Sequence, residues 1–174
     1  MDHLKSLIRT IPDFPKPGIQ FRDLTTLFQN PAGLRETVEA LAAPYKTRNI
    51  DMVVGIESRG FILGAPIAME LGKGFVPVRK PGKLPGKTHG VDYTLEYGTD
   101  RLEIHADALE RGARVLVVDD LLATGGTMEA TCKLLDSLGC KVESCAVVVE
   151  LVDLKGRQRL GGQDIFRLIE FEGE

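Results

Sequence analysis

Hydrophobic residues fall along this chain in short blocks, and the spacing within each block predicts its secondary structure. Helical spacing predicts a short first helix, capped by Asp2, and a second helix after Asn30-Pro31, a good cap and first-turn pair. Two further helices should end at Gly72 and Gly139, and Pro66 leaves room for a kink in the earlier one or a delayed start. The four helical patterns occupy residues 4–11, 34–45, 60–71 and 127–138.

Runs rich in β-branched residues predict strands between these helices. Alternation on both sides of Gly98-Thr99 indicates a hairpin of residues 93–97 and 101–105. The proline-rich residues 12–18 should be stiff and extended, and residues 80–92 should form a long loop. The other strands are expected over residues 52–56, 74–79, 114–118, 142–149 and 165–169.

The alternation of strands and helices predicts an α/β fold. We expect a mostly parallel, twisted sheet with helices on both faces and one antiparallel hairpin. At 174 residues the chain has the size of one globular domain, and no repeat, low-complexity tract or linker divides it. A single domain over residues 1–174 is therefore expected, with an N-terminal arm at 1–30 and a flexible loop and hairpin at 80–105.

Composition and charge narrow the class of function. Hydrophobic residues make up 43% and charged residues 27%, which is ordinary for a folded chain, and the net charge of −3 argues against a general nucleic-acid binder. Apolar runs are too short to cross a bilayer, and the N-terminus lacks a signal peptide, so we expect a cytoplasmic protein without membrane contact. The three cysteines have no zinc-like spacing and should be small buried hydrophobes in a reducing compartment: Cys132, Cys140 and Cys145.

Residues 115–127 form the most informative stretch, since an apolar strand, two carboxylates, a tight turn and a helix start follow one another. Backbone N–H groups at a helix start favour an anion, glycines let a phosphate approach closely, and ionised aspartates accept hydrogen bonds from a sugar diol. This combination predicts a ribose 5-phosphate site; the alternative is a capped turn whose acids face water. The candidate residues are Asp119, Asp120, Ala123, Thr124, Gly125, Gly126 and Thr127.

Two other segments could bind anions. Glu57-Ser58-Arg59-Gly60 follows a strand and opens a helix, which predicts a second anion site; the alternative is an ordinary cap with a solvated Arg59. No acid lies between Glu70 and Asp92, and the basic loop in this interval is either a solvated loop or an active-site lid. The loop carries Arg79, Lys80, Lys83 and Lys87, and Lys73 is the fifth cation of the interval.

Residues 115–127 resemble the phosphoribosyl-diphosphate motif of the type I phosphoribosyltransferases. Residues 14–23, 57–61, 79–86 and 95–98 resemble the adenine-specific members of that family, and the similarity runs from Leu4 to Phe171. The resemblance implies the family's fold, with residues 1–30 as a hood and the hairpin as a lid. It implies purine salvage, in which ribose 5-phosphate moves from 5-phosphoribosyl 1-diphosphate to N9 of adenine, giving AMP and diphosphate. A homodimer is implied, as is Mg²⁺ bound through the substrate rather than by protein ligands.

The resemblance also implies roles for single residues. Diphosphate would contact Ser58, Arg59, Arg79, Lys80 and Lys83, with Arg79 reaching into a neighbouring subunit, and a cis peptide bond is expected between Glu57 and Ser58. Glu96 would act as acid or base near N7 of the purine, with Tyr97 covering the site. The base would stack on Phe21 and meet backbone groups of Gln20 and Arg22, with apolar walls from Leu122 and Leu151.

Two points bear on the substrate. Ala123 stands where the 6-oxopurine branch of the family usually has a carboxylate, so hypoxanthine and guanine are less expected than adenine, while xanthine and orotate stay open. A regulator that keeps the phosphoribosyl site as a sensor is the second hypothesis. Such a protein usually has a DNA-binding extension or a basic RNA-binding face, and we expect neither here.

Overall fold

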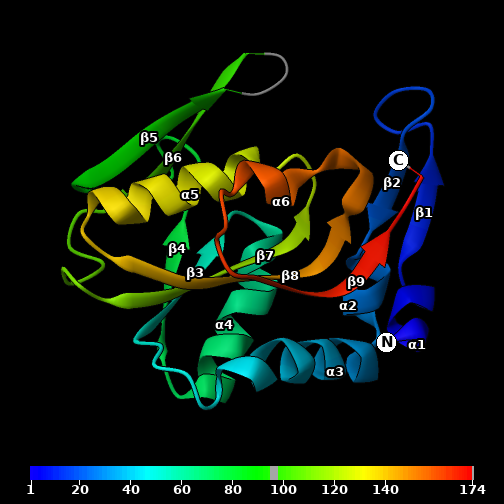
Figure 1. Cartoon of the computed structure of the whole chain (residues 1–174), viewed down its shortest axis with the longest axis horizontal. Coiled ribbons are helices and arrows are strands. Elements are labelled where there is room, and N and C mark those ends of the chain that lie inside the picture. The colour runs from blue at the N-terminus through cyan, green and yellow to red at the C-terminus, as the bar shows by residue number, and fades with distance from the viewer. Residues whose placement is uncertain (95–97, 174) are drawn as a thin grey trace.

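A five-stranded parallel sheet forms the centre of the protein, with the strand order β4-β3-β7-β8-β9 (Figure 1). The computed structural model describes residues 1–94 and 98–173. The carboxyl ends of parallel strands meet at one edge of a sheet, which is where ligands collect in such folds. The strands are β3 (Met52–Ile56), β4 (Gly74–Val78), β7 (Arg114–Leu122), β8 (Lys141–Leu151) and β9 (Ile165–Phe171).

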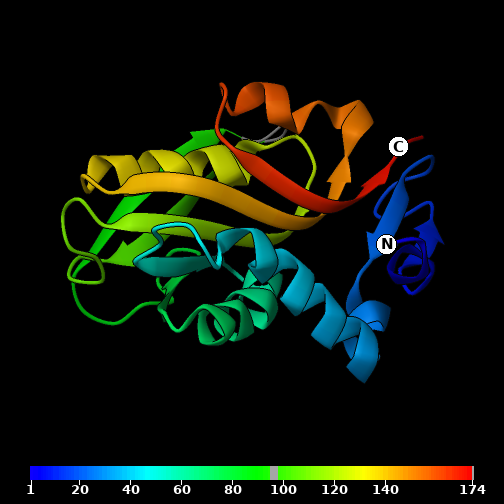
Figure 2. The ribbon, with the colours of Figure 1, turned by 60° about the horizontal axis from the view of Figure 1, so that its bottom comes forward.

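Helices cover both faces of this sheet, so each face has its own buried cluster of apolar side chains (Figures 1 and 2). On one face lie α3 (Pro31–Ala42) and α4 (Arg59–Leu71), and on the other lie α5 (Gly126–Ser137) and the short α6 (Gly156–Arg159). The single-turn helices η1 (Ala43–Tyr45) and η2 (Val152–Leu154) lie in the connections. No helix in the described part of the chain is long and apolar enough to cross a membrane.

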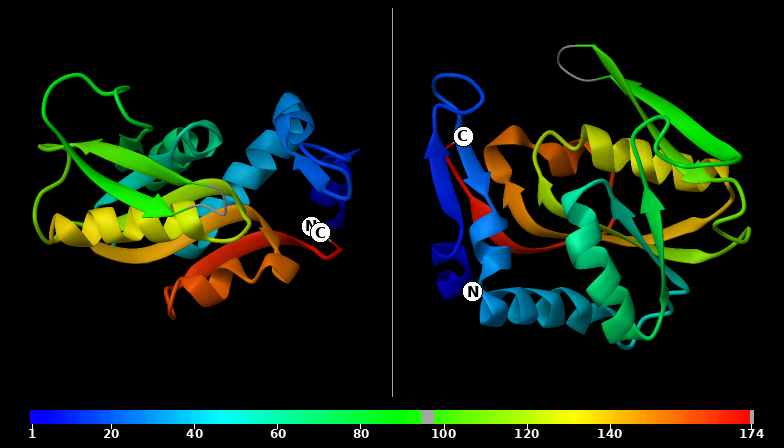
Figure 3. Two further views of the ribbon diagram at one scale, coloured as in Figure 1. Left: turned by 90° about the horizontal axis from the view of Figure 1, so that it is seen from above. Right: turned by 180° about the vertical axis from the view of Figure 1, so that it is seen from behind.

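The N-terminal segment forms a small unit beside the edge strand β9 (Figure 3). It contains α1 (Asp2–Ser6), the antiparallel strands β1 (Arg9–Pro12) and β2 (Gln20–Asp23), and α2 (Thr25–Gln29). Lys5 Nζ donates to the Glu170 carbonyl at 2.7 Å, and its ammonium lies 4.5 Å from the centre of the Phe171 ring. We call residues 1–30 the hood.

A second antiparallel hairpin extends above α5 (Figure 1). Its strands are β5 (Thr88–Thr94) and β6 (Thr99–His105), in a register that pairs Tyr93 with Asp100. Backbone hydrogen bonds of 2.9 and 2.8 Å between Arg79 and Glu103 join the hairpin to the residue after β4. The hairpin is thus connected to the loop of residues 80–87 at the start of that loop.

The predicted α/β fold is confirmed, and several element boundaries are corrected. The first helix ends at Ser6, and Ile11 lies in β1, where it pairs with Phe21; the helical spacing of Ile11 was misleading because this backbone pairs with β2. The loop predicted over residues 80–92 is shorter, since β5 already begins at Thr88. The second helical pattern begins inside α3 and ends in η1, and α4 begins at Arg59 without delay although it contains Pro66.

Other predictions hold in outline. Asn30 caps α3 by accepting a hydrogen bond from the Gly33 N–H at 2.9 Å, and Gly72 ends α4 in the left-handed conformation. The strand predicted over residues 114–118 continues to Leu122, which places both aspartates within β7. Cys140 and Cys145 are buried and Cys132 is half-buried, and all three are free thiols.

Candidate active site

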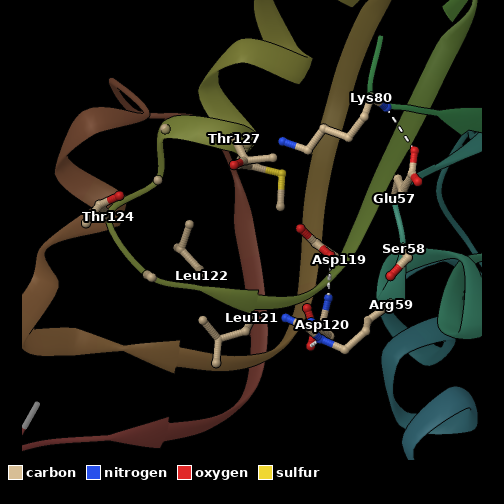
Figure 4. A pocket seen from close by; sticks show the side chains of 14 residues that line it. Glu57, Ser58, Arg59, Lys80, Asp119, Asp120, Leu121, Leu122, Thr124 and Thr127 are labelled. Carbon is tan, nitrogen blue, oxygen red and sulfur yellow. Dashed lines mark hydrogen bonds and ion pairs between the residues drawn. The ribbon is translucent and has the colours of Figure 1, made fainter. Parts of the chain in front are cut away.

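A pocket of about 230 Å³ opens at the carboxyl ends of β3 and β7 (Figure 4). Three segments that are distant in sequence line it: residues 57–59, Lys80, and residues 119–128. The sequence predicted a ribose 5-phosphate site and a second anion site as separate motifs. Parallel pairing of Val53 and Val54 with Leu116 and Val117 aligns the two strands, so both motifs border one cavity.

The loop between β7 and α5 has a backbone that requires glycine. Gly125 has φ +83°, and a Cβ atom on it would lie 2.6 Å from the Gly156 carbonyl oxygen. Gly125 is the N-cap of α5, and no side chain in the described part of the chain caps this helix start. The first N–H groups of α5 therefore face the pocket without a capping side chain, as a phosphate-binding helix start requires. The hydroxyls of Thr124 and Thr127 flank them (Figure 4).

Asp119 and Asp120 point in different directions, as neighbours on a strand do (Figure 4). Asp120 is 3% exposed and forms an ion pair with Nε of Arg59. Asp119 Oδ1 accepts a hydrogen bond from the Asp120 N–H at 2.9 Å. Burial and the negative charge of Asp120 raise the pKa of Asp119 well above its ordinary value. The sequence motif predicts the same role for both carboxylates, but their surroundings differ: Asp120 holds Arg59, and Asp119 faces the cavity.

The loop of residues 57–60, which is the second predicted anion site, approaches β7 closely. A Cβ atom on Gly60 would lie 2.7 Å from the Val118 carbonyl oxygen and 3.2 Å from Asp119 Oδ1. Only a glycine therefore allows the start of α4 to contact the end of β7. The peptide bond between Glu57 and Ser58 is cis, as predicted. Ser58 lines the cavity through this loop (Figure 4).

Glu57 is a site residue that sequence reasoning did not single out. Its Oε2 accepts the Lys80 N–H at 2.9 Å and Arg79 Nε at 3.3 Å, and its Oε1 accepts Arg79 Nη2 at 3.4 Å. Burial raises the pKa of Glu57, but the hydrogen bonds from Lys80 and Arg79 outweigh it, and the pKa lies below its ordinary value. An acid directly after a buried parallel strand was the available signal. Glu57 therefore connects the loop of residues 57–60 to the start of the basic loop at Arg79 and Lys80.

The predicted diphosphate cations are only partly brought together. Lys80 lines the cavity, and Arg59 lies at its edge (Figure 4). The Arg79 side chain instead folds back onto Glu57 and donates from Nη1 to the Lys83 carbonyl at 3.2 Å. Lys83 is exposed, and neither Arg79 nor Lys83 is among the described residues that line this pocket.

The predicted base-binding residues are divided between two cavities. A second cavity of about 330 Å³ lies under the hood, and Phe21, Arg22 and Arg59 line it. Phe21 meets Phe14 edge to face with ring centres 5.1 Å apart, and Arg22 Nη1 donates to Thr10 Oγ1 at 2.8 Å. Arg59 lines both cavities.

The remaining site predictions have mixed outcomes. Leu122 lines the first pocket, whereas Gln20 and Leu151 are not among the described residues that line either cavity. Leu151 is instead buried in the core cluster on the α3 and α4 side of the sheet. Glu96 and Tyr97 lie outside the described residues. Gly156, which the β7–α5 loop contacts at Gly125, was missed because its segment has no apolar pattern.

Comparison with known proteins places this geometry among related molecules. The model of the phosphoribosyl transferase domain family matches residues 23–163. A protein of Acaryochloris marina described as an adenine phosphoribosyltransferase is 62% identical over 168 residues, which cover 97% of this chain and 99% of that protein. The crystal structure of the enzyme of that name from Thermoanaerobacter pseudethanolicus superposes with a TM-score of 0.94 at 52% identity, over 98% of this chain and 99% of that one.

A further structure is informative because of its ligands. The Saccharomyces cerevisiae adenine phosphoribosyltransferase, complexed with adenine and an imino-altritol bisphosphate, is 40% identical and superposes with a TM-score of 0.91. The alignment covers 97% of each chain.

Proposed function

This chain belongs to the adenine phosphoribosyltransferases, and from that membership we propose a role for each part of its site. It is a purine-salvage enzyme that transfers ribose 5-phosphate from 5-phosphoribosyl 1-diphosphate to N9 of adenine. The reaction forms the N9–C1′ bond of AMP and breaks the bond from C1′ to diphosphate. One observation carries our assignment: a glycine-rich helix start, a carboxylate that faces the cavity and a second anion loop line the same pocket.

The β7–α5 loop is our proposed site for the 5-phosphate. The backbone N–H groups of Gly126 and Thr127 and the hydroxyls of Thr124 and Thr127 are its donors, with Ala123 and Gly125 shaping the turn. Asp119 faces the cavity and accepts hydrogen bonds from the ribose hydroxyls, while Asp120 supports the site through Arg59. Positioning of C1′ by these contacts lowers the barrier because the departing diphosphate leaves an oxocarbenium-like ribose.

Diphosphate is assigned to the opposite side of the cavity. Ser58 and Arg59 lie at the start of α4, and the Lys80 ammonium points into the pocket (Figure 4). These groups stabilise the negative charge that develops on the leaving group. Arg79 and Lys83 would join them from the basic loop, which acts as part of a lid over residues 80–105. For Arg79 this requires release from Glu57.

Magnesium fits this end of the cavity, since carboxylates and phosphates are the oxygen ligands it prefers. In residues 1–94 and 98–173 no group of three His, Cys, Asp or Glu side chains could hold a metal ion. We propose that Mg²⁺ binds through the diphosphate and the ribose hydroxyls of the substrate, and that Asp119, the carboxylate that faces the cavity, accepts hydrogen bonds from those hydroxyls. When bound, the ion neutralises charge on the leaving group.

The hood is our proposed adenine site. Phe21 lines the hood cavity and offers a flat aromatic face, and backbone groups of Gln20 and Arg22 in β2 would contact the purine edge. Leu122 adds an apolar wall on the ribose side. Leu151 lies in the core cluster on the other face of the sheet and is not assigned to the base. As N9 bonds to C1′, the proton leaving N7 would pass to Glu96, with Tyr97 covering the base.

A homodimer is supported by an exposed apolar face on α4. Ile62 and Met69 lie two turns apart on this helix and are 44% and 81% exposed. The Arg79 guanidinium lies 6.0 Å from the Phe61 ring on the same helix, beside this face. Sedimentation of the wild type should give a dimer and Met69→Lys should weaken it; a monomeric wild type would overturn the proposal.

A cytoplasmic location, supported by three free cysteines, can be checked by cell fractionation.

A panel of bases tests the function. Purified protein, phosphoribosyl diphosphate and Mg²⁺ are mixed separately with adenine, hypoxanthine, guanine, xanthine and orotate, and nucleotide formation is measured. We expect AMP from adenine and at most traces of product from the other bases. Equal or faster turnover of another base would contradict adenine specificity. Retention of nucleic acid with a steep salt dependence, and no consumption of any base, would favour the regulator instead.

A further inference from the structure

The side chain of Lys80 bridges the cavity and the hairpin. It lines the pocket beside Asp119 and Thr127, and its backbone N–H is held by Glu57 (Figure 4). At its far end, Nζ forms an ion pair with Asp100 and donates to the Tyr93 hydroxyl at 2.9 Å. The ammonium is therefore fixed by two groups of the hairpin while it faces the phosphate-binding cavity.

Tyr93 and Asp100 form a matched pair on adjacent strands. They stand opposite each other in the register of β5 and β6, and the Tyr93 hydroxyl donates to Asp100 Oδ2 at 3.1 Å. Tyr93 is only 8% exposed, so its hydroxyl has a fixed place. The Lys80 ammonium also lies 5.5 Å from the centre of the Tyr93 ring, within the range of a cation–π contact. Each of the three polar groups thus contacts the other two.

This arrangement matters because a lysine side chain is flexible. Free in solvent, its four-carbon stem samples many rotamers, and fixing it when a ligand binds carries an entropy penalty. Asp100 and Tyr93 remove that freedom before the ligand arrives. Preorganised charge stabilises an anionic ligand more than charge that must be ordered on binding.

We propose that Asp100 and Tyr93 are positioning residues for phosphoribosyl diphosphate binding, which act by holding the Lys80 ammonium at the diphosphate end of the cavity. The inference rests on the proposed role of Lys80 as a diphosphate ligand. The hairpin would then have two roles. It is part of the proposed lid, and β5, which precedes Glu96 in sequence, is joined to the diphosphate site through the Lys80 side chain.

Steady-state kinetics of two variants test the proposal, with isothermal titration of phosphoribosyl diphosphate in Mg²⁺ as a second readout. Asp100→Asn removes the charge, and Tyr93→Phe removes only the hydroxyl. We expect Asp100→Asn to raise the KM and Kd for phosphoribosyl diphosphate by about tenfold and Tyr93→Phe to raise them by about threefold. The KM for adenine should be unchanged in both variants. Asp92→Asn is the matched control, since it removes an exposed carboxylate that pairs with Arg101 on the same hairpin. It should leave both KM values unchanged.

A double-mutant cycle separates positioning from a merely structural role. In a Lys80→Met background, Asp100→Asn should have no further effect on the KM or Kd for phosphoribosyl diphosphate. The proposal is overturned if the two substitutions act additively, or if Asp100→Asn lowers kcat and leaves binding intact. Failure of the wild type to make AMP would instead reject the proposed function, and the titrations would still decide the role of Asp100.

Discussion

The stability of the hood can be tested at one buried carboxylate that joins its two strands to the start of α2. Asp23, at the end of β2, is 8% exposed. Its Oδ1 accepts the Thr25 hydroxyl at 2.7 Å and the Thr25 N–H at 3.0 Å, and its Oδ2 accepts Arg9 Nε of β1 at 3.1 Å. The hydrogen bond from the Thr25 hydroxyl, followed by the contacts with Arg9, lowers the pKa of Asp23 from 3.8 to about 2.

That pKa shift sets the size of the effect. A fall from 3.8 to about 2 corresponds to at most about 2 kcal/mol of native-state stability at neutral pH. The figure is an upper value because the Arg9 side chain is 57% exposed and its attraction is screened. Since the folded pKa lies below the unfolded one, this stability is present above pH 3.8 and is lost as the pH falls towards about 2.

Asp23→Asn mimics the protonated carboxyl, so it isolates this effect. Urea unfolding of wild type and variant, followed by circular dichroism from about pH 7 to about pH 3, gives the difference in unfolding free energy. We expect a gap of about 1–2 kcal/mol at neutral pH that narrows by about half at about pH 3, because the stability is lost in full only below the folded pKa of about 2. Asp92→Asn, which removes an exposed carboxylate, should show a gap of only a few tenths of a kcal/mol. A gap for Asp23→Asn that stays constant with pH would refute the reasoning.

Three further substitutions address the active site. Gly125→Ala should destabilise the protein by about 2–4 kcal/mol in urea unfolding and abolish phosphoribosyl diphosphate binding in titrations, because the left-handed backbone and the Gly156 carbonyl both oppose a Cβ atom; unchanged binding would contradict the assigned phosphate loop. The double variant Asp119→Asn with Asp120→Asn should raise the KM for phosphoribosyl diphosphate by about 10–100-fold at unchanged circular dichroism, and unchanged kinetics would reject diol binding. Glu96→Ala should lower kcat more than it raises the KM for adenine, and a loss confined to KM would argue against proton transfer.

Local pattern was sufficient to predict most of the central sheet. The strand over residues 52–56 has the predicted bounds, because a continuous apolar run between polar ends has few alternatives as a buried parallel strand. The hood was less predictable. Leu4, Leu7, Ile8 and Ile11 match helical spacing, yet long-range pairing of Ile11 with Phe21 places the last of them in a strand. Tertiary contacts override spacing in such short segments.

The site residues likewise divide into those that a local motif predicts and those whose roles depend on contacts between distant segments. Residues 119–127 were identified because the motif is contiguous and each residue type has a chemical reason to be there. The different roles of Asp119 and Asp120 could not be predicted, because they depend on Arg59, which is 61 positions from Asp120 in sequence. Glu57, Asp100 and Tyr93 likewise acquire their roles only through neighbours on other elements. Pairwise side-chain geometry of this kind is absent from a linear pattern.

The claim that the β7–α5 loop holds the 5-phosphate can be tested most directly by a crystal structure of this protein with AMP. We expect the phosphate against the N–H groups of Gly126 and Thr127, the ribose hydroxyls at Asp119, and the base beside Phe21. A phosphate bound at the start of α4, with the loop of residues 123–127 empty, would contradict the account.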